Sequence, residues 1–324
     1  MSSHAMSAES KPMTAPRPGW RRHLWHAGLL VMLAMMWGSS FLMVKVALRD
    51  FSPVEALTGR MAIAALFFTA ALLIRRKQVE RSRKAWALMA AMAVIGNVFP
   101  YLLINWGQTR VETGTAAILM GIVPLVTAVL AQAFTRGERF HLWKAIGIAV
   151  GFAGVVVLFG GPQLSGGHGV MWGAAAILLA ALGLASGTIL ADKASDYHSI
   201  PIGFGVMWIA AIVCVPLWLG IDGGALPARV SWQSAAAVAG LAIFSTALPT
   251  LVLIYLVRSA GPSFAGFTNY LVPVIGVALG VALLNEALTW YAVVALGLII
   301  AGIVVGQIGG RKGGKKAAAP AADR

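Results

Sequence analysis

A stripe of hydrogen-bonding side chains is the clearest chemical signal in the sequence. Its members are spaced by four, four and three residues: Asn97, Tyr101, Asn105 and Gln108. On a helix this spacing places all four on one face, where they either bond a neighbouring helix or line a wet cavity. Asn97 and Tyr101 lie farther from the end of the surrounding apolar run, so we expect these two to line a cavity.

Two basic residues lie within or beside long apolar runs, where a charge is costly unless it is paired or functional. Lys45 can extend its amino group to an aqueous boundary. Arg60 lies deeper, and it could hold a bound carboxylate, pair with a helix C-terminus, or bridge two halves of the chain. No Asp or Glu lies centrally in any of these runs, which disfavours a proton relay through a buried carboxylate.

Further cavity candidates are aromatic or polar side chains in the middle of other apolar runs. Trp37 lies too deep for a tryptophan of the membrane interface, although it could simply pack against a neighbour. Ser40 could bond back to its own helix or let another helix approach closely. The remaining candidates share one run: Phe267, Asn269 and Tyr270.

Four prolines interrupt apolar runs at Pro100, Pro124, Pro249 and Pro273. Proline removes a helix hydrogen bond, so each is either a hinge or a static kink. Glu138 and Glu286 precede apolar runs by a few residues, and we expect each carboxylate to cap the helix that follows it.

The chemistry of an enzyme is not evident in the sequence. The chain has one cysteine, Cys214, and six histidines, and we find no Ser/His/Asp set, metal motif or nucleotide-binding loop. We therefore expect no catalytic residues, no cofactor and no metal site.

Composition decides which elements position these residues. Of the 324 residues, 59% are hydrophobic and 11% are charged, whereas a soluble chain carries roughly 25% charged residues. A membrane helix needs about 20 mostly apolar residues. Ten such runs predict an all-α integral membrane protein with spans at 27–48, 54–74, 85–106, 113–134, 142–160, 170–191, 202–220, 232–256, 264–284 and 288–308.

Basic residues predict the orientation, because cytoplasmic loops are rich in Lys and Arg. With both termini in the cytoplasm, 20 of the 25 basic residues lie on that side. The net charge of +14 is therefore a topology signal, and we expect the lipid bilayer, not nucleic acid, as partner.

An internal repeat divides the chain. An offset of 148 or 149 residues pairs Lys45 with Lys193, Pro100 with Pro249, and Pro124 with Pro273. Each half then holds five spans, and an odd number inverts the second half relative to the first. The predicted organisation is a cytoplasmic segment 1–26, repeat 27–160, extracytoplasmic linker 161–169, repeat 170–308 and a disordered basic tail 309–324.

Short motifs in both halves resemble the EamA-type members of the drug/metabolite transporter superfamily. In the first half they are Trp37-Gly38-Ser39-Ser40-Phe41 through Lys45, Ser52-Pro53, Arg60, Thr113-Gly114-Thr115-Ala116-Ala117, Pro124 and Gly137-Glu138. In the second half they are Leu271-Val272-Pro273 and Asn285-Glu286. The resemblance covers residues 27–308 and implies a ten-helix transporter with a cavity between the halves.

The expected function is a secondary transporter of the inner membrane that moves small metabolites, with amino acids as the leading substrate class and export as the direction. Its cavity walls would be aromatic and uncharged, and a homodimer is compatible with this arrangement. Two alternatives remain open: a proton-coupled multidrug efflux pump, and a membrane enzyme or assembly protein that transports nothing.

Overall fold

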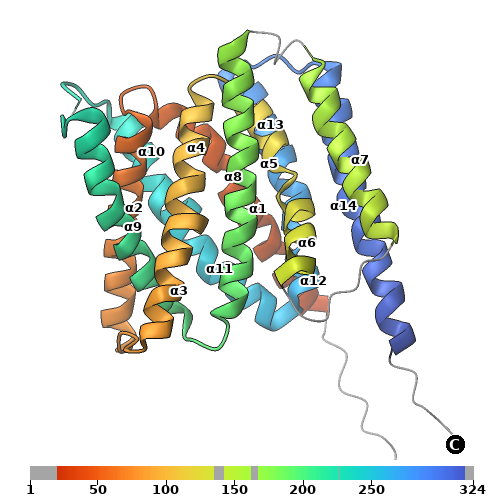
Figure 1. Cartoon of the computed structure of the whole chain (residues 1–324), viewed down its shortest axis with the longest axis horizontal. Coiled ribbons are helices and arrows are strands. Elements are labelled where there is room, and N and C mark those ends of the chain that lie inside the picture. The colour runs from red at the N-terminus through yellow and green to blue at the C-terminus, as the bar shows by residue number, and fades with distance from the viewer. Residues whose placement is uncertain (1–19, 135–141, 162–166, 226, 318–324) are drawn as a thin grey trace, which may run out of the picture.

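The computed structural model describes residues 20–134, 142–161, 167–225 and 227–317 (Figure 1). Within these ranges every regular element is a helix. Their bounds are α1 Trp20–Ala47, α2 Pro53–Ile74, α3 Arg83–Ala93, α4 Phe99–Gln108, α5 Thr113–Met120, α6 Val123–Phe134, α7 Leu142–Phe159, α8 His168–Lys193, α9 Ser199–Asp222, α10 Trp232–Ala242, α11 Leu248–Ala260, α12 Pro262–Ala265, α13 Thr268–Leu284 and α14 Trp290–Ala317.

Several of these helices join end to end into longer rods. Among the described residues, 8 helical stretches are long and apolar enough to cross a membrane, including Arg83–Gln108 and Trp232–Ala260. Two shorter apolar stretches follow, Thr268–Leu284 and Trp290–Gly306. The protein is therefore an all-helical integral membrane protein. Eight predicted spans correspond to the longer stretches, and the ninth and tenth correspond to the shorter pair.

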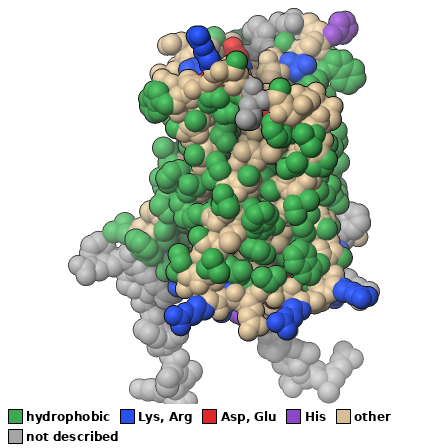
Figure 2. All heavy atoms as spheres, turned by 90° about the vertical axis from the view of Figure 1, so that its left-hand side faces the viewer, with side chains coloured by type: hydrophobic (Ala, Val, Ile, Leu, Met, Phe, Trp, Pro, Cys, Tyr) green, Lys and Arg blue, Asp and Glu red, His purple; other side chains and the backbone are tan. Residues whose placement is uncertain are grey.

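The lateral surface has the character of a lipid-facing surface. Figure 2 shows hydrophobic side chains over the side of the molecule, with Lys and Arg gathered at its two ends. Large apolar side chains such as Leu66, Trp172 and Ile212 are 60%, 66% and 63% exposed. Contact of so much apolar surface with water would be unfavourable, whereas the acyl chains of a bilayer solvate it.

Helix directions alternate along the bundle. α1 begins and α14 ends at the same end, which we call the terminal end, and the opposite end is the distal end (Figure 1). The rod of α3 and α4 runs from the terminal end to the distal end, and the rod of α10 and α11 runs the other way (Figure 1).

Local sequence explains where several helices start. Ser52 and Glu55 form a reciprocal capping box at the start of α2, and Pro53 occupies a position that needs no N–H donor. Ser82 and Ser231 accept from backbone N–H groups at the starts of α3 and α10. These polar N-caps mark the first residue of each helix and so determine where the connections at the two ends of the bundle stop.

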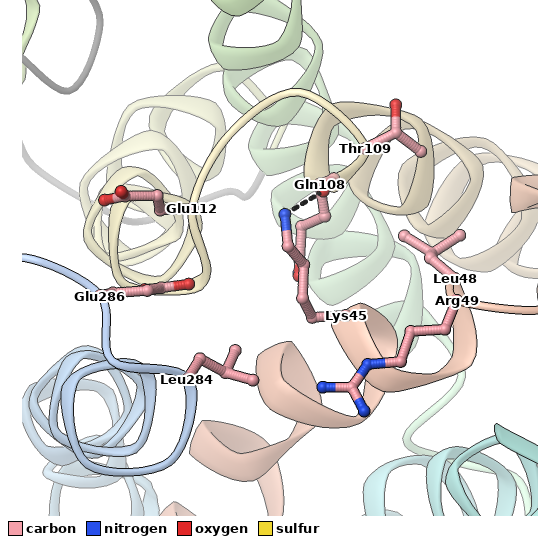
Figure 3. A pocket seen from close by; sticks show the side chains of 8 residues that line it. All are labelled: Lys45, Leu48, Arg49, Gln108, Thr109, Glu112, Leu284 and Glu286. Carbon is pink, nitrogen blue, oxygen red and sulfur yellow. Dashed lines mark hydrogen bonds between the residues drawn. The ribbon is translucent and has the colours of Figure 1, made fainter. Parts of the chain in front are cut away.

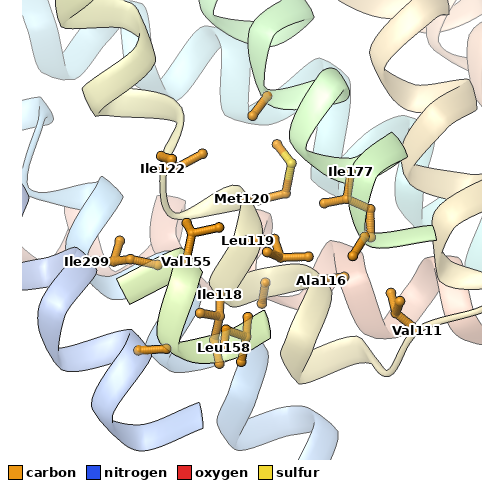
Figure 4. Packing of buried hydrophobic residues seen from close by; sticks show 14 of the residues in the cluster. Val111, Ala116, Ile118, Leu119, Met120, Ile122, Val155, Leu158, Ile177 and Ile299 are labelled. Atoms are coloured by element: carbon orange, nitrogen blue, oxygen red, sulfur yellow. The ribbon is translucent and has the colours of Figure 1, made fainter. Parts of the chain in front are cut away.

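The largest apolar cluster surrounds α5 (Figure 4). Ile118 and Leu119 of α5 are almost fully buried, and they pack with Leu158 of α7, Ile177 of α8 and Ile299 of α14. α7 and α14 also meet backbone to backbone, because a Cβ on Gly302 would lie 2.5 Å from the carbonyl oxygen of Gly147. Small residues allow such close approach between membrane helices.

The C-terminal tail differs from its prediction. Residues 309–317, expected to be disordered, continue α14, which ends at Ala317. A helix already formed by an apolar run extends into the following Gly, Ala and Lys residues because propagation costs less than nucleation. Residues 1–19, 162–166 and 318–324, which include most of the predicted N-terminal segment and of the linker, lie outside the described residues.

Candidate functional site

Two of the rods, α3 with α4 and α10 with α11, are each interrupted near the middle by a π-helical turn. These turns span Val94–Val98, between α3 and α4, and Ile243–Ala247, between α10 and α11. Pro100 and Pro249 follow two residues after them. A π turn adds one residue to the helix and leaves a backbone carbonyl for another donor, and such turns are frequent at functional sites.

One polar side chain in each turn supplies that donor. Asn97 donates from Nδ2 to the carbonyl oxygen of Met92 at 2.9 Å. Thr246 donates from Oγ1 to the carbonyl oxygen of Leu241 at 2.9 Å. Thr246 lies 149 residues after Asn97, the offset that also relates Pro249 to Pro100. Thr246 was not among the site residues predicted from the sequence, although this offset from Asn97 could have identified it.

Arg60 meets the second of these turns. Its Nε donates to Oγ1 of Thr246 at 2.8 Å, and its guanidinium carbon lies 3.7 Å from the centroid of the Tyr101 ring. Arg60 is 3% exposed, and its α2 neighbours Leu57 and Met61 are fully buried. The sequence left three roles open for Arg60. The hydrogen bond to Thr246 corresponds to one of them, a bridge between the two halves of the chain.

The candidates on α1 and around the start of α13 are linked by packing, because Phe264 lies in the cluster of Trp37 and its ring contacts that of Phe267. Trp37 packs with an apolar cluster that includes Leu256 and Ala265. Ser40 donates its hydroxyl to the carbonyl oxygen of Trp37 at 2.6 Å, so it bonds back to its own helix. The rings of Phe267 and Tyr270 lie 5.7 Å apart. Beside them, Asn269 is partly buried.

The rest of the polar stripe points toward the distal end. Asn105 donates from Nδ2 to the carbonyl oxygen of Pro53 at 3.0 Å. Gln108 is fully buried, and neither polar atom of its side chain has a hydrogen-bond partner among the described residues. Tyr101 is the member of this stripe whose ring lies against Arg60.

A pocket of about 450 Å³ opens at the distal end (Figure 3). Its charged lining residues are Lys45, Arg49, Glu112 and Glu286. Lys45 donates from Nζ to the carbonyl oxygens of Gln108 and Val111 at 2.9 and 3.1 Å. It thereby caps Gln108, the last residue of α4, where a cation is favourable, and also binds the turn that follows.

Glu286 holds the same turn from the second half of the chain. Its Oε1 and Oε2 accept from the backbone N–H groups of Thr113 and Gly114 at 2.6 and 2.7 Å, at the start of α5. The prediction that Glu286 caps the following helix is thus wrong, because Asn285 adopts a left-handed conformation with φ 54° and the chain reverses. Glu138, the other predicted cap, lies outside the described residues.

Other hydrogen bonds also join the two halves at the distal end. Ser231 donates to the carboxylate of Asp50 through both its hydroxyl and its amide. Ser52 donates to the carboxylate of Asp222. In addition, Ser234 donates to the carbonyl oxygen of Val46 at 3.0 Å. These bonds join the two halves of the chain at the distal end, beside the pocket.

Two carboxyl groups at the distal end have shifted pKa values. Burial and the nearby charge of Glu286 raise the pKa of Glu112 above the usual glutamate range, and the Lys45 ammonium opposes this rise. Hydrogen bonds from Ser231 and Ser234 lower the pKa of Asp50.

The hinge candidates occupy different settings. Pro100 and Pro249 are the second residues of α4 and α11, directly after the π turns. Pro124 is the second residue of α6, after the break at Gly121 and Ile122, while α13 continues through Pro273.

As for metals, the described residues contain no group of three or more His, Cys, Asp or Glu side chains that could hold an ion.

Comparison with known proteins adds named relatives. The chain is 28% identical over 283 residues to the inner membrane transporter YedA of Escherichia coli, covering 86% of this chain and 89% of that protein. It is 27% identical to a probable terminal-alkyne amino-acid exporter of Streptantibioticus cattleyicolor, covering 85% and 90%. It is also 28% identical to a probable amino-acid metabolite efflux pump of Escherichia coli, covering 85% and 92%.

Fold and family comparisons agree with these relatives. One solved crystal structure matches with a TM-score of 0.65 at 16% identity, covering 89% of this chain and 99% of the other, which supports the fold alone. The model of the EamA-like transporter family matches residues 24–160 and again residues 171–306. The chain is therefore a multi-pass inner membrane protein that belongs to the EamA-like transporter family.

Proposed function

We propose that this protein is a secondary transporter that exports small metabolites, chiefly amino acids and related compounds, across the inner membrane by alternating access. In this proposal ten helices form two inverted five-helix halves, residues 27–160 and 170–308, and both termini lie in the cytoplasm. The halves enclose the substrate near the middle of the bilayer.

The matched π turns carry this proposal. Irregular backbone at membrane depth is tolerated where it is buried in protein or lines a cavity, and transporters place their sites at paired discontinuous helices. Here the two turns lie 149 residues apart, each with a polar side chain bonded to the carbonyl oxygen five residues earlier. The two rods that contain them run in opposite directions (Figure 1), as inverted halves require.

In this proposal the substrate enters from the terminal end, which is the cytoplasmic side. At the distal end the carboxylates of Asp50 and Glu286 accept hydrogen bonds across the two halves, and Ser52 donates one. In the proposed cycle these bonds break when the pathway opens on that side. Export is also the direction in the names of two relatives, an amino-acid exporter and an amino-acid metabolite efflux pump.

The site residues are proposed on the same grounds. Tyr101, beside Arg60 and the second π turn, and Asn97, within the first, are the leading candidates for the cavity wall. Trp37, Ser40, Phe267, Asn269 and Tyr270 would line its continuation between α1 and α13. Pro100 and Pro249 are the leading hinge candidates because each adjoins a π turn, and a homodimer remains part of the proposal.

Flux into liposomes that contain the purified protein tests this function. A panel of labelled amino acids is supplied with and without an imposed pH gradient. Saturable flux is expected, and Tyr101→Ala and Trp37→Ala should lower it while the protein still inserts into the membrane. Ile212→Ala is the matched control, because this side chain is 63% exposed on the lipid-facing surface.

The outcomes separate the alternatives. Flux of some amino acids that ignores the gradient establishes a facilitator. Gradient-driven transport of lipophilic cations alone would favour the multidrug pump instead. Absence of flux for every amino acid would contradict the proposed substrate class.

A further inference from the structure

The guanidinium of Arg60 is a buried charge whose partner is missing from the protein. Of its five N–H donors, Nε bonds Thr246, and no other hydrogen bond of this side chain is found among the described residues. No Asp or Glu among those residues forms an ion pair with it. The ring of Tyr101 covers one face, at 3.7 Å.

A neutral hydroxyl and an aromatic ring compensate this charge only in part. Taking a cation out of water into an apolar interior is expensive, and buried cations are normally paired with an anion. A cation–π contact contributes about 0.5–2 kcal/mol, which is small beside that desolvation cost. The arrangement is therefore incomplete electrostatically without an anion.

Bridging the two halves does not by itself require a charge. Trp208 lies 148 residues after Arg60, at the offset that pairs Lys45 with Lys193. Trp208 donates from its neutral indole Nε1 to Oγ1 of Thr69 at 2.9 Å, joining α9 to α2, whereas Arg60 joins α2 to the π turn between α10 and α11. Two N–H donors thus bond a threonine of the other half of the chain: the neutral indole of Trp208 and the charged guanidinium of Arg60.

The geometry of the remaining donors selects the kind of anion. Nε bonds Thr246 and the Tyr101 ring covers one face, whereas no hydrogen bond of Nη1 or Nη2 is found among the described residues. Two parallel N–H donors in the plane of a guanidinium match the two oxygens of a carboxylate. Resting on the proposed transport function, we propose that Arg60 binds the carboxylate of the transported substrate at the interface of the two halves, beside Tyr101 and Thr246.

The test compares compounds that differ only at this group. For one amino-acid side chain, the free acid, its amide and the decarboxylated amine are measured for binding by thermal stabilisation in detergent and for flux in liposomes. The wild-type protein is expected to prefer the acid. Arg60→Gln should weaken acid binding about 10- to 100-fold, the size of a lost charged hydrogen-bond pair, and change amide binding far less. Arg60→Lys should fall between them.

Trp208→Phe is the matched control, because it removes the neutral bridge at the equivalent position and should leave the acid-to-amide preference unchanged. A second readout excludes simple misfolding. Without substrate, Arg60→Gln should unfold at a temperature equal to or above that of the wild type, because replacing an uncompensated buried charge relieves its desolvation cost.

The results distinguish this inference from the proposed function. If the wild type moves amino acids and Arg60→Gln retains the acid-to-amide preference, the carboxylate assignment is overturned and the transporter stands. If the wild-type protein carries amides or amines as well as it carries acids, the carboxylate assignment is likewise overturned and the transporter stands. If neither binding nor flux is found for any compound, both proposals fail.

Discussion

The amino group of Lys45 and the carboxylate of Glu286 bind the same turn, between α4 and α5, from two sides. Lys45 binds the carbonyl oxygens of Gln108 and Val111 at its beginning, and Glu286 binds the N–H groups of Thr113 and Gly114 at its end. One of these side chains belongs to the first half of the chain and the other to the second. Their opposite charges suit the opposite ends of the two helix dipoles.

Glu286→Gln should favour opening of the distal end. A neutral amide accepts through one oxygen only, so a charged hydrogen bond worth about 1.5–3 kcal/mol is weakened. Spin labels at Thr109 and Leu288, in a Cys214→Ala background, should report longer distances in this variant than in the parent. Glu112→Gln serves as the control on the same turn, and identical distance distributions in parent and Glu286→Gln would refute the role of Glu286.

Glu112 should make stability fall as the pH rises. Its pKa is raised in the folded protein, so the folded state binds the proton more tightly than the unfolded state. Stability is then greatest below the usual glutamate pKa and is lost as the pH rises through the folded-state value. Glu112→Gln should unfold at a higher temperature than the wild type at neutral pH, with the difference vanishing below about pH 4. A constant difference from acid to neutral pH would contradict this origin.

Removing the side-chain donor of the second π turn, Thr246, should lower the free energy of unfolding more than removing that of the first, Asn97. Asn97→Leu leaves the carbonyl oxygen of Met92 without its donor, at a cost of about 1–3 kcal/mol. Thr246→Val removes the same kind of bond and also the acceptor of Arg60, so it should destabilise the protein more. Thermal or denaturant unfolding in detergent measures both, and a larger effect for Asn97→Leu would disprove the ranking.

The contact of α7 with α14 should tolerate no added methyl group. A Cβ on Gly302 would lie 2.5 Å from the carbonyl oxygen of Gly147, whereas a Cβ on Gly297, on the same helix, meets nothing within 4 Å. Gly302→Ala should therefore destabilise the protein by about 1–3 kcal/mol through overpacking. Gly297→Ala should be neutral or slightly stabilising because alanine favours helix; equal unfolding temperatures would argue against a direct backbone contact.

The sequence was sufficient to predict helix positions because bilayer thickness fixes the length of an apolar run. The run predicted at 54–74 is α2, Pro53–Ile74, and the one at 142–160 is α7, Leu142–Phe159. Ser52 even marks the first of these starts through its capping box. Such boundaries depend on local chemistry and on composition, both of which are present in the chain itself.

Long-range partners were not predictable in the same way. Nothing near Glu286 in the sequence indicates that its carboxylate binds the start of α5, because that contact depends on how the two halves dock. The π turn at Val94–Val98 was also missed. It lies inside one predicted span, and Asn97 and the following Pro100 do not by themselves distinguish a π turn from a kink, so an even helical spacing was assumed for Asn97 and Tyr101. The cavity-lining role of these residues stays a prediction.

The short helix α13, as the ninth of the ten proposed spans, would give the protein an uneven hydrophobic thickness. Thr268–Leu284 has 17 residues, and α2 has 22; at 1.5 Å per residue these lengths are about 26 and 33 Å. A typical hydrocarbon core is about 30 Å thick, so in the proposed ten-span arrangement lipids beside α13 would compress while those beside α2 would stay extended. With α13 spanning the membrane, acyl-chain length becomes a variable that acts on one side of the protein, and thinner membranes relieve the strain beside this helix.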